Sequence, residues 1–411
     1  MSRLLAIFGC LFMIYSCKPT DTNPLTNILH SEHEIFETIL DDLEKYELQV
    51  IYTQIDRDLD NHPIFTTYKY RVDKNQYFYP ASTVKMPVAF LAMEKVNRLN
   101  INGFDIFCKM QTDSAFEGQS RVLHDSTSAD LNPSLAHYIK KVFLVSDNDA
   151  FNRLYEFVGQ QTIHELLTAK GFSDQRLVHR LSIPLSTEQN QHTNPIVFYK
   201  DDTLVYHQGP AFNVQRYTPS SSIKKGEGHM IGDSLVSKPM DFSNKNYISL
   251  DDLHGVLQAV IFPEAQFEEH RFQLTEVDYK LLYQFMSQLP EESYYPRYSL
   301  SDYYDSYVKF FLYGDSYEPI PKHIRIFNKV GLAYGYMIDV AYVVDFENHV
   351  EFFLSAVIHV NENQIYDDGV YEYDSLGLPF LAQLGRSVYQ YELERPKKQL
   401  PDLSEFAVEY D

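Results

Sequence analysis

The chain has 411 residues, of which 44% are hydrophobic and 22% are charged, so it can bury a large globular core. Its formal net charge is −22. A chain this acidic, without basic tracts, is a poor ligand for nucleic acid or for anionic membrane surfaces, which argues against both classes of partner.

The first residues have the pattern of an export signal. Arg3 precedes a short apolar run, residues 4–15, which is too short to cross a bilayer as a finished helix. Cys17 follows the small residue Ser16 and precedes a polar stretch, which resembles the lipobox of bacterial lipoproteins. We therefore expect a signal peptide over 1–16 and a lipid anchor on Cys17, which would hold the protein at the cell envelope, facing the periplasm or the cell surface. A plain secretory signal with a chance cysteine is the alternative.

Two other cysteines are present. Cys10 would leave with the signal peptide, so Cys108 would be the only free thiol of the mature chain and no intrachain disulfide could form. Cys108 lies in an apolar segment, which is typical of a buried, inert thiol and not of a nucleophile.

Helices and strands are predicted from residue 33 onwards, after a tether over 17–32 that shows no periodicity. Apolar residues at helical spacing predict a helix over 33–46. Two β-rich runs, 48–55 and 65–72, flank a turn-like segment and predict a hairpin. A long helix is then predicted over 84–99.

The middle of the chain is mostly helical in pattern. Two helices are predicted within 134–159, with a break at 146–148. Residues 173–248 are polar and loop-rich, with one short β-piece at 196–204. Two more helices, each entered through a capping residue, are predicted over 250–262 and 275–289.

The C-terminal part returns to β-rich sequence. Three strands and a last helix are predicted over 324–330, 334–344, 349–360 and 378–391. This order predicts an α/β (α+β) fold in which both ends of the chain build one antiparallel sheet, flanked by helices, around an inserted all-α lobe. We expect this two-lobed domain to cover 33–395, an acidic tail to cover 396–411, and a cleft to lie between the lobes.

Three motifs that can carry chemistry follow one another along the chain. The first is Ser-x-x-Lys, in which Ser82 and Lys85 lie on one face at the start of a helix. Burial would lower the pKa of Lys85, and its neutral amine could then take the proton of Ser82 and make it a nucleophile. Such pairs also occur by chance on protein surfaces.

The other two motifs can position a substrate. In Ser-Asp-Asn, Ser146 can shuttle a proton and Asn148 can bind a substrate amide, although these residue types also form ordinary capping loops. Lys329-Val330-Gly331 ends a β-rich run. The cation of Lys329 could lie near a substrate carboxylate, and Gly331 would allow a ligand to approach the backbone closely. An exposed strand lysine is the plainer interpretation of the third motif.

Together the motifs resemble those of the penicillin-recognising serine hydrolases, the class A β-lactamases and penicillin-binding proteins. The similar segments are 79–87, 146–154 and 329–341, and the resemblance covers roughly 33–392. It implies an acyl-enzyme reaction with Ser82 as nucleophile, Lys85 as general base and Ser146 as proton relay. It further implies that Asn148 orients the substrate, that Lys329 anchors its carboxylate, and that the N–H groups of Ser82 and Leu332 form the oxyanion hole.

The chain departs from this family at two positions. Class A β-lactamases carry a glutamate two residues after an arginine, which activates the deacylating water. Here the residue two positions after Arg180 is Ser182, and the nearest acid is Glu188, which a longer loop could bring into place as the catalytic base. Val330 stands where the family has Thr or Ser. The loss of that hydroxyl is expected to weaken β-lactam binding by about tenfold or more.

The leading function is therefore a serine hydrolase of class A β-lactamase type. A cell-wall peptidase or esterase with slow deacylation, and a catalytically silent cell-envelope binding protein, remain as alternatives. We expect a small-molecule or peptidoglycan-like acyl substrate, a monomer, and no cofactor or metal, because no His or Cys cluster has ligand spacing.

Overall fold

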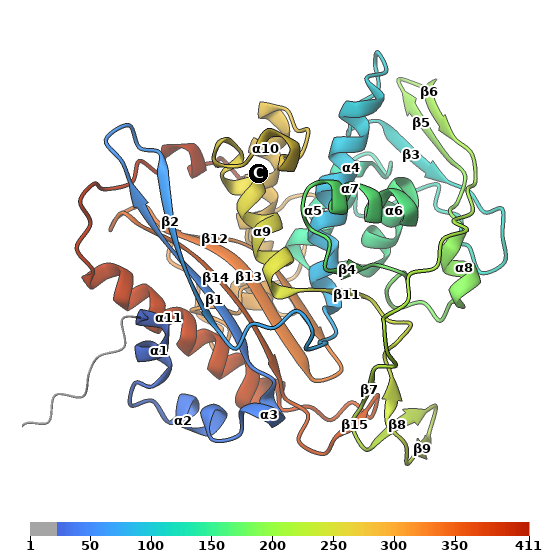
Figure 1. Ribbon diagram of the computed structural model, residues 1–411. Coiled ribbons are helices and arrows are strands. Elements are labelled where there is room, and N and C mark those ends of the chain that lie inside the picture. The colour runs from blue at the N-terminus through green and yellow to red at the C-terminus, as the bar shows by residue number, and fades with distance from the viewer. Residues whose placement is uncertain (1–22, 411) are drawn as a thin grey trace, which may run out of the picture.

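The computed structural model describes residues 23–410, so the predicted signal peptide and Cys17 lie outside the described residues. Its centre is a five-stranded antiparallel sheet (Figure 1). In spatial order the strands are β12 (Ile324–Ala333), β13 (Tyr336–Asp345), β14 (Val350–His359), β1 (Gln49–Arg57) and β2 (Pro63–Tyr70).

This sheet joins the two ends of the chain, as predicted. β1 pairs with β14 and with β2, so the N-terminal hairpin extends the C-terminal meander. Strands β13 and β14 are buried along their whole length, because helices cover both faces of the sheet. The α/β prediction is confirmed, and the predicted strands differ from the observed ones only at their ends.

One face of the sheet is covered by helices from both ends of the chain (Figure 1). They are α1 (Pro24–Leu29), α2 (Glu34–Leu40), α3 (Leu43–Tyr46) and α11 (Leu378–Glu394). The tether prediction is wrong for α1, because Leu25 and Leu29 are fully buried in the apolar cluster between the sheet and α11. Asn23 caps this helix by accepting a hydrogen bond from Leu25 N at 3.0 Å.

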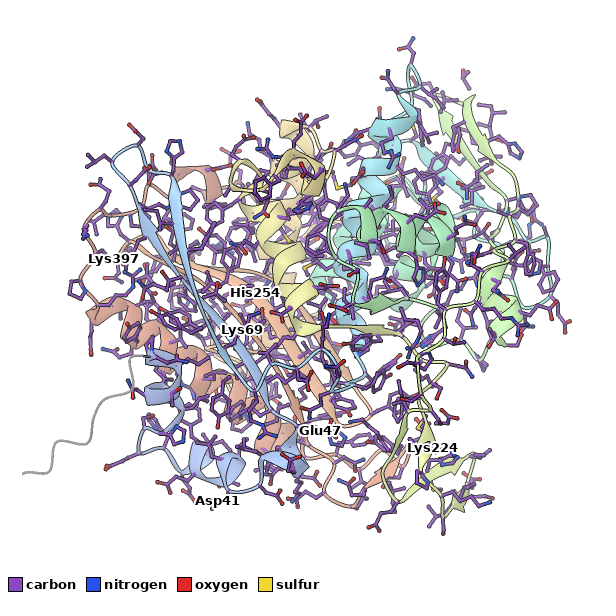
Figure 2. The ribbon with its side chains drawn as sticks, in the orientation of Figure 1. Asp41, Glu47, Lys69, Lys224, His254 and Lys397 are labelled. Carbon is purple, nitrogen blue, oxygen red and sulfur yellow. The ribbon has the colours of Figure 1, made fainter. Side chains whose placement is uncertain are left out.

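Two helices pack on the opposite face, α9 (Leu250–Ile261) and α10 (Glu276–Ser287). Ser249 and Thr275 cap them, as predicted. His254, labelled in Figure 2, is a polar contact between α9 and the sheet: its two ring nitrogens bond Ser355 Oγ at 2.8 Å and Thr53 Oγ1 at 2.9 Å. Both ring nitrogens are therefore satisfied inside the core.

The helical lobe lies beyond α9 and α10, at the right of Figure 1. Its helices are α4 (Lys85–Leu99), α5 (Leu135–Leu144), α6 (Asn148–Val158), α7 (Gln160–Ala169) and α8 (Thr187–Gln191). The inserted lobe of the prediction is confirmed, although α7 and α8 were not predicted. Cys108 is 4% exposed in the core of this lobe, and burial raises the pKa of its thiol, which agrees with an inert cysteine. Within the described residues, no helix is both long and apolar enough to cross a bilayer.

The lobe is not purely helical, which corrects the prediction of an all-α lobe: residues 173–248 form strands. That segment contributes most of the small strands. They are β4 (Gln175–Arg176), β5 (Ile196–Lys200), β6 (Thr203–Gln208), β7 (Lys224–Lys225), β8 (Gly228–Ile231), β9 (Ser234–Val236), β10 (Met240–Asp241) and β11 (Tyr247–Ile248). β3 (Lys109–Thr112) pairs with β5, and β15 (Ile365–Tyr366) pairs in parallel with β8. The β-piece predicted at 196–204 corresponds to β5 and the start of β6. The other strands were missed because such short runs carry little periodicity.

An ion pair fastens this segment to the central sheet. Glu47 ends α3 with a backbone φ of 45°. Its carboxylate accepts hydrogen bonds from Lys225 Nζ of β7 at 2.5 Å and from the hydroxyl of Tyr336 of β13 at 3.0 Å. Figure 2 labels Glu47 and Lys224, the neighbour of Lys225, on either side of this junction.

The acidic C-terminal tail is docked, contrary to the prediction of a separate tail. Leu403 is 4% and Phe406 1% exposed, and the Phe406 ring packs at 5.2 Å from Tyr283 and 5.0 Å from Tyr342. Burial of these two apolar side chains outweighs the surrounding acidic residues.

Candidate active site

Ser82 lies on a strained turn at the entrance of α4. The 3-10 turn Ala81–Val84 directly precedes the helix, and both the backbone N–H and the hydroxyl of Thr83 donate to Pro80 O, at 3.1 and 2.6 Å. Ala81 has a φ of 48°, a left-handed conformation that costs a non-glycine residue free energy. The turn leaves the Ser82 side chain partly exposed at the positive end of the helix.

Gly331 lets strand β12 pass directly against this turn. A Cβ atom added at Gly331 would lie 2.6 Å from Pro80 O and 3.2 Å from Ala81 Cβ. The close approach that this glycine permits is therefore made by the backbone of the turn that carries Ser82.

Replacing Gly331 by alanine should push β12 and the Ser82 turn apart. We expect a loss of about 1–3 kcal/mol in the free energy of unfolding, as for other overpacked sites, together with slower acylation of Ser82. Chemical denaturation and stopped-flow acylation measure the two effects. As a control, Gly209→Ala has no atom within 4 Å of the new Cβ and should change neither; equal losses in both variants would contradict a specific contact.

The amine of Lys85 is buried directly beside the second motif. Lys85 is 0% exposed, and its Nζ lies 2.5 Å from Ser146 O, 3.1 Å from Ser146 Oγ and 2.7 Å from Asn148 Oδ1. Within the described chain, it makes no hydrogen bond to the Ser82 hydroxyl. Catalytic hydrogen bonds often form only once substrate is bound, so this geometry is compatible with Lys85 as the base for Ser82.

Ser146 connects two buried lysines. Its Oγ is 3.1 Å from Lys85 Nζ and 2.9 Å from Lys329 Nζ, and its backbone φ is 57°. Burial lowers the pKa of Lys85 well below its usual value, and the nearby charge of Lys329 lowers it further. Burial also lowers the pKa of Lys329, to about 7. A hydroxyl between two amines whose pKa values are both lowered by burial is well placed to pass a proton.

The middle residue of the second motif has a structural role. Asp147 caps α6 by accepting a hydrogen bond from Ala150 N at 2.8 Å, and its carboxylate is 3.4 Å from Lys141. The capping interpretation therefore holds for Asp147, while its neighbours Ser146 and Asn148 surround the Lys85 amine.

The structure brings Ser182, and not Glu188, to the site. Asn148 Nδ2 donates to Ser182 Oγ at 2.8 Å, and Ser182 lines the cleft together with Ser82. Glu188 is exposed in the first turn of α8 and is not among the residues that line this cleft. The hypothesis that a longer loop brings Glu188 to the reacting centre has no support in this arrangement.

The third motif is also placed differently from the expectation. The Val330 side chain is 4% exposed and belongs to the apolar cluster on the α11 face of the sheet, so it does not line the cleft. The amine of Lys329 is buried and bonded to Ser146 Oγ and to Val330 O at 2.8 Å. Leu332 is 42% exposed and lines the cleft, as an oxyanion-hole residue must.

A polar cluster that the sequence did not reveal lies within the sheet beside Lys329. Lys309 is buried and donates to Asn328 Oδ1 at 2.7 Å, while Asn328 Nδ2 donates to Asp339 Oδ1 at 2.8 Å. Burial lowers the pKa of Lys309 and raises that of Asp339, and the charge of Asp339 raises the pKa of Lys329. Only the pairing of β12 with β13 brings Asn328 and Asp339 together, so no local signal could show the cluster.

The cleft that contains Ser82 has a volume of about 430 Å³. Sequence reasoning missed the aromatic part of its lining. The lining residues are Tyr79, Ala81, Ser82, Asn148, Leu181, Ser182, Leu332, Ala333, Tyr334, Asp367, Gly369, Tyr371 and Tyr373. The size suits a small acyl group.

Comparison with known proteins shows the family of the chain. A model of the beta-lactamase enzyme family matches residues 37–391, most of the chain. The chain belongs to this family. No curated protein matches it in sequence.

Two solved structures illustrate the likeness of this beta-lactamase family member to others. A β-lactamase from Sphaerobacter thermophilus aligns with a TM-score of 0.51 at 12% identity, covering 90% of this chain and 98% of the other. A class A β-lactamase from Clostridium kluyveri aligns with a TM-score of 0.46 at 15% identity, covering 86% and 97%. At such identities the first alignment supports the fold alone.

Proposed function

We propose that this beta-lactamase family member hydrolyses acyl substrates through an acyl-enzyme on Ser82. The observation that carries the proposal is the buried, low-pKa amine of Lys85, which lies on the first helical turn after Ser82 and contacts Ser146 and Asn148. Keeping an uncharged amine beneath a partly exposed hydroxyl is what nucleophilic catalysis by serine requires. A protein that only binds its ligand has no such requirement.

In the proposed acylation step, the neutral Lys85 amine takes the Ser82 proton while Ser82 Oγ attacks the acyl carbonyl carbon. The backbone N–H groups of Ser82 and Leu332 stabilise the developing oxyanion. The C–O, C–S or C–N bond to the leaving group then breaks, and Ser146 passes a proton to that group from the Lys85 ammonium.

Deacylation is expected to be the slow half of the reaction. It adds water to the acyl-enzyme, and a base must take a proton from that water. Ser182, the residue bonded to Asn148, carries a hydroxyl and not a carboxylate. This observation favours the second candidate, a peptidase or esterase that releases its acyl group slowly, over an efficient β-lactamase.

Intact mass spectrometry tests the proposal. The protein is incubated with a fluorescent penicillin and, separately, with a neutral phenyl thioester, and the modified peptide is then mapped. We expect an adduct on Ser82 that forms faster than it is lost. A chain that forms no adduct and releases no product with any acyl donor would contradict the catalytic proposal.

Introducing the missing carboxylate should speed deacylation. In Ser182→Glu the new side chain starts from an exposed position on the cleft, next to Asn148, and we expect acyl-enzyme release to be about tenfold faster or more. Ser182→Gln has nearly the same shape without the base and should stay slow. The decay of the adduct mass measures the rate, and equal decay in the two variants would mean that a base at this position does not act on the water.

A further inference from the structure

The lining of the Ser82 cleft is unusual in its charge. Asp367 is its one charged side chain, and among the described lining residues there is no Lys, Arg or His. A carboxylate-bearing substrate would therefore meet a like charge at this wall, whereas an ammonium would meet an opposite one.

The carboxylate of Asp367 is available to a ligand. Asp367 is exposed just after β15, with a backbone φ of 60°, and its side chain makes no hydrogen bond or ion pair within residues 23–410. Desolvation raises the pKa of this carboxyl, while the charges of Lys245 and His229 lower it from a distance. A bound cation would compensate the same desolvation.

Tyrosines held in fixed positions flank this carboxylate. The hydroxyl of Tyr371 accepts a hydrogen bond from Asp367 N at 2.9 Å, and that of Tyr373 accepts one from Gly335 N at 2.9 Å. The two rings are 5.1 Å apart with an interplanar angle of 38°. A Cβ added at Gly369, which lies between Asp367 and Tyr371 in sequence, would meet nothing within 4 Å, so the wall has open space for a ligand. Fixed aromatic rings beside a carboxylate suit cation–π binding of an ammonium group.

The nearby lysines do not supply a positive wall, and Lys85 is 0% exposed. Lys329 is 1% exposed, and its amine is bonded to Ser146. Lys245 donates to the Tyr334 hydroxyl at 3.1 Å and lies 5.3 Å from the centre of that ring, and it does not line the cleft.

We propose that the acyl substrate carries an ammonium group, which the Asp367 carboxylate and the rings of Tyr371 and Tyr373 bind while the acyl carbonyl lies at Ser82. This inference rests on the proposed function and names its substrate class. It also implies that β-lactams, which carry a carboxylate, acylate Ser82 more slowly than an ammonium-bearing substrate does.

Matched phenyl thioesters test the inference. Their acyl chains end in a trimethylammonium group, in a neutral tert-butyl group of the same shape, or in a carboxylate. We expect kcat/KM for acylation by the ammonium thioester to exceed that of the tert-butyl thioester by about tenfold. In Asp367→Asn the ratio should fall to about one, and in Asp367→Lys the carboxylate thioester should become the preferred one. Asp374→Asn removes an exposed charge outside the lining and should keep the wild-type ratio.

The outcomes separate the two proposals. Equal rates for the ammonium and tert-butyl thioesters in the wild type, or an unchanged ratio in Asp367→Asn, would overturn the substrate class while leaving the acyl-enzyme intact. Failure of all three thioesters to acylate Ser82 would overturn the proposed function and this inference with it.

Discussion

Replacing Lys85 by alanine is expected to slow acylation of Ser82 by about 10²- to 10⁴-fold, the usual contribution of a positioned general base. The Lys85 amine is the nearest candidate base on the Ser82 helix, and no other residue of the first motif can accept a proton at neutral pH. Stopped-flow acylation with the neutral phenyl thioester measures the loss, and far-ultraviolet circular dichroism checks that the fold persists.

A second lysine of the same helix provides the matched control. Lys95 is also largely buried on α4, with a pKa lowered by burial to about 8, but its amine bonds Phe157 O and Gln208 Oε1 in the helical lobe. Lys95→Ala should acylate at close to the wild-type rate. If Lys85→Ala also does so, Lys85 is not the base.

The pH dependence of acylation follows from the same residue. Only the neutral amine can act as a base, so the rate should rise as pH increases through the pKa of Lys85. Because burial lowers that pKa well below 10.5, the rate should level off well below pH 10.5. In Lys85→Ala this rising limb should disappear.

Replacing Glu156 by alanine is expected to lower the free energy of unfolding by about 3–5 kcal/mol. Glu156 is 2% exposed on α6 and pairs with Arg153 at 2.9 Å and with Arg180 at 2.8 Å. Its loss leaves Arg180 without a carboxylate partner among the described residues, and leaves Arg153 paired only with the exposed Asp149, at 3.1 Å. Arg180 also donates to His192 O at 2.6 Å, so the loop that carries Ser182 should loosen as well.

Urea denaturation measures this loss of stability. Glu165→Ala is a suitable control, because Glu165 is exposed on α7 and its side chain bonds Gln161 alone among residues 23–410. Its effect should stay within about 0.5 kcal/mol. If Glu156→Ala also lowers the free energy of unfolding by only about 0.5 kcal/mol, the attraction within the buried ion pairs does little more than offset the desolvation of their charges.

Much of the fold could be predicted because its elements carry local signals. The helices α9 and α10 follow the capping residues Ser249 and Thr275, and the long strands are rich in β-branched and aromatic residues. The docked tail was missed because its apolar anchors, such as Phe406, are single residues in an acidic segment. Phe406 is held by the rings of Tyr283 and Tyr342, which are distant in sequence, so the sequence around Phe406 does not show this contact.

The candidate nucleophile could be found in the same way. Ser82 and Lys85 are on one helical turn, and the order of the three motifs along the chain made their convergence foreseeable. By itself, the sequence determined which residues are candidates for acylation, and that Glu188 is the acid nearest in the chain to the position of the missing glutamate.

Only the tertiary structure decided which side chains reach the cleft. It buries Lys329, turns Val330 to the other face of the sheet, and places Ser182 beside Asn148. It also builds the wall with Asp367 through the pairing of β15 with β8, two strands far apart in the chain. The physical reason has two parts. The face of the sheet on which a side chain lies depends on the register of its strand, and the pairing of very short strands depends on non-local hydrogen bonds. The periodicity of residues along the chain specifies neither.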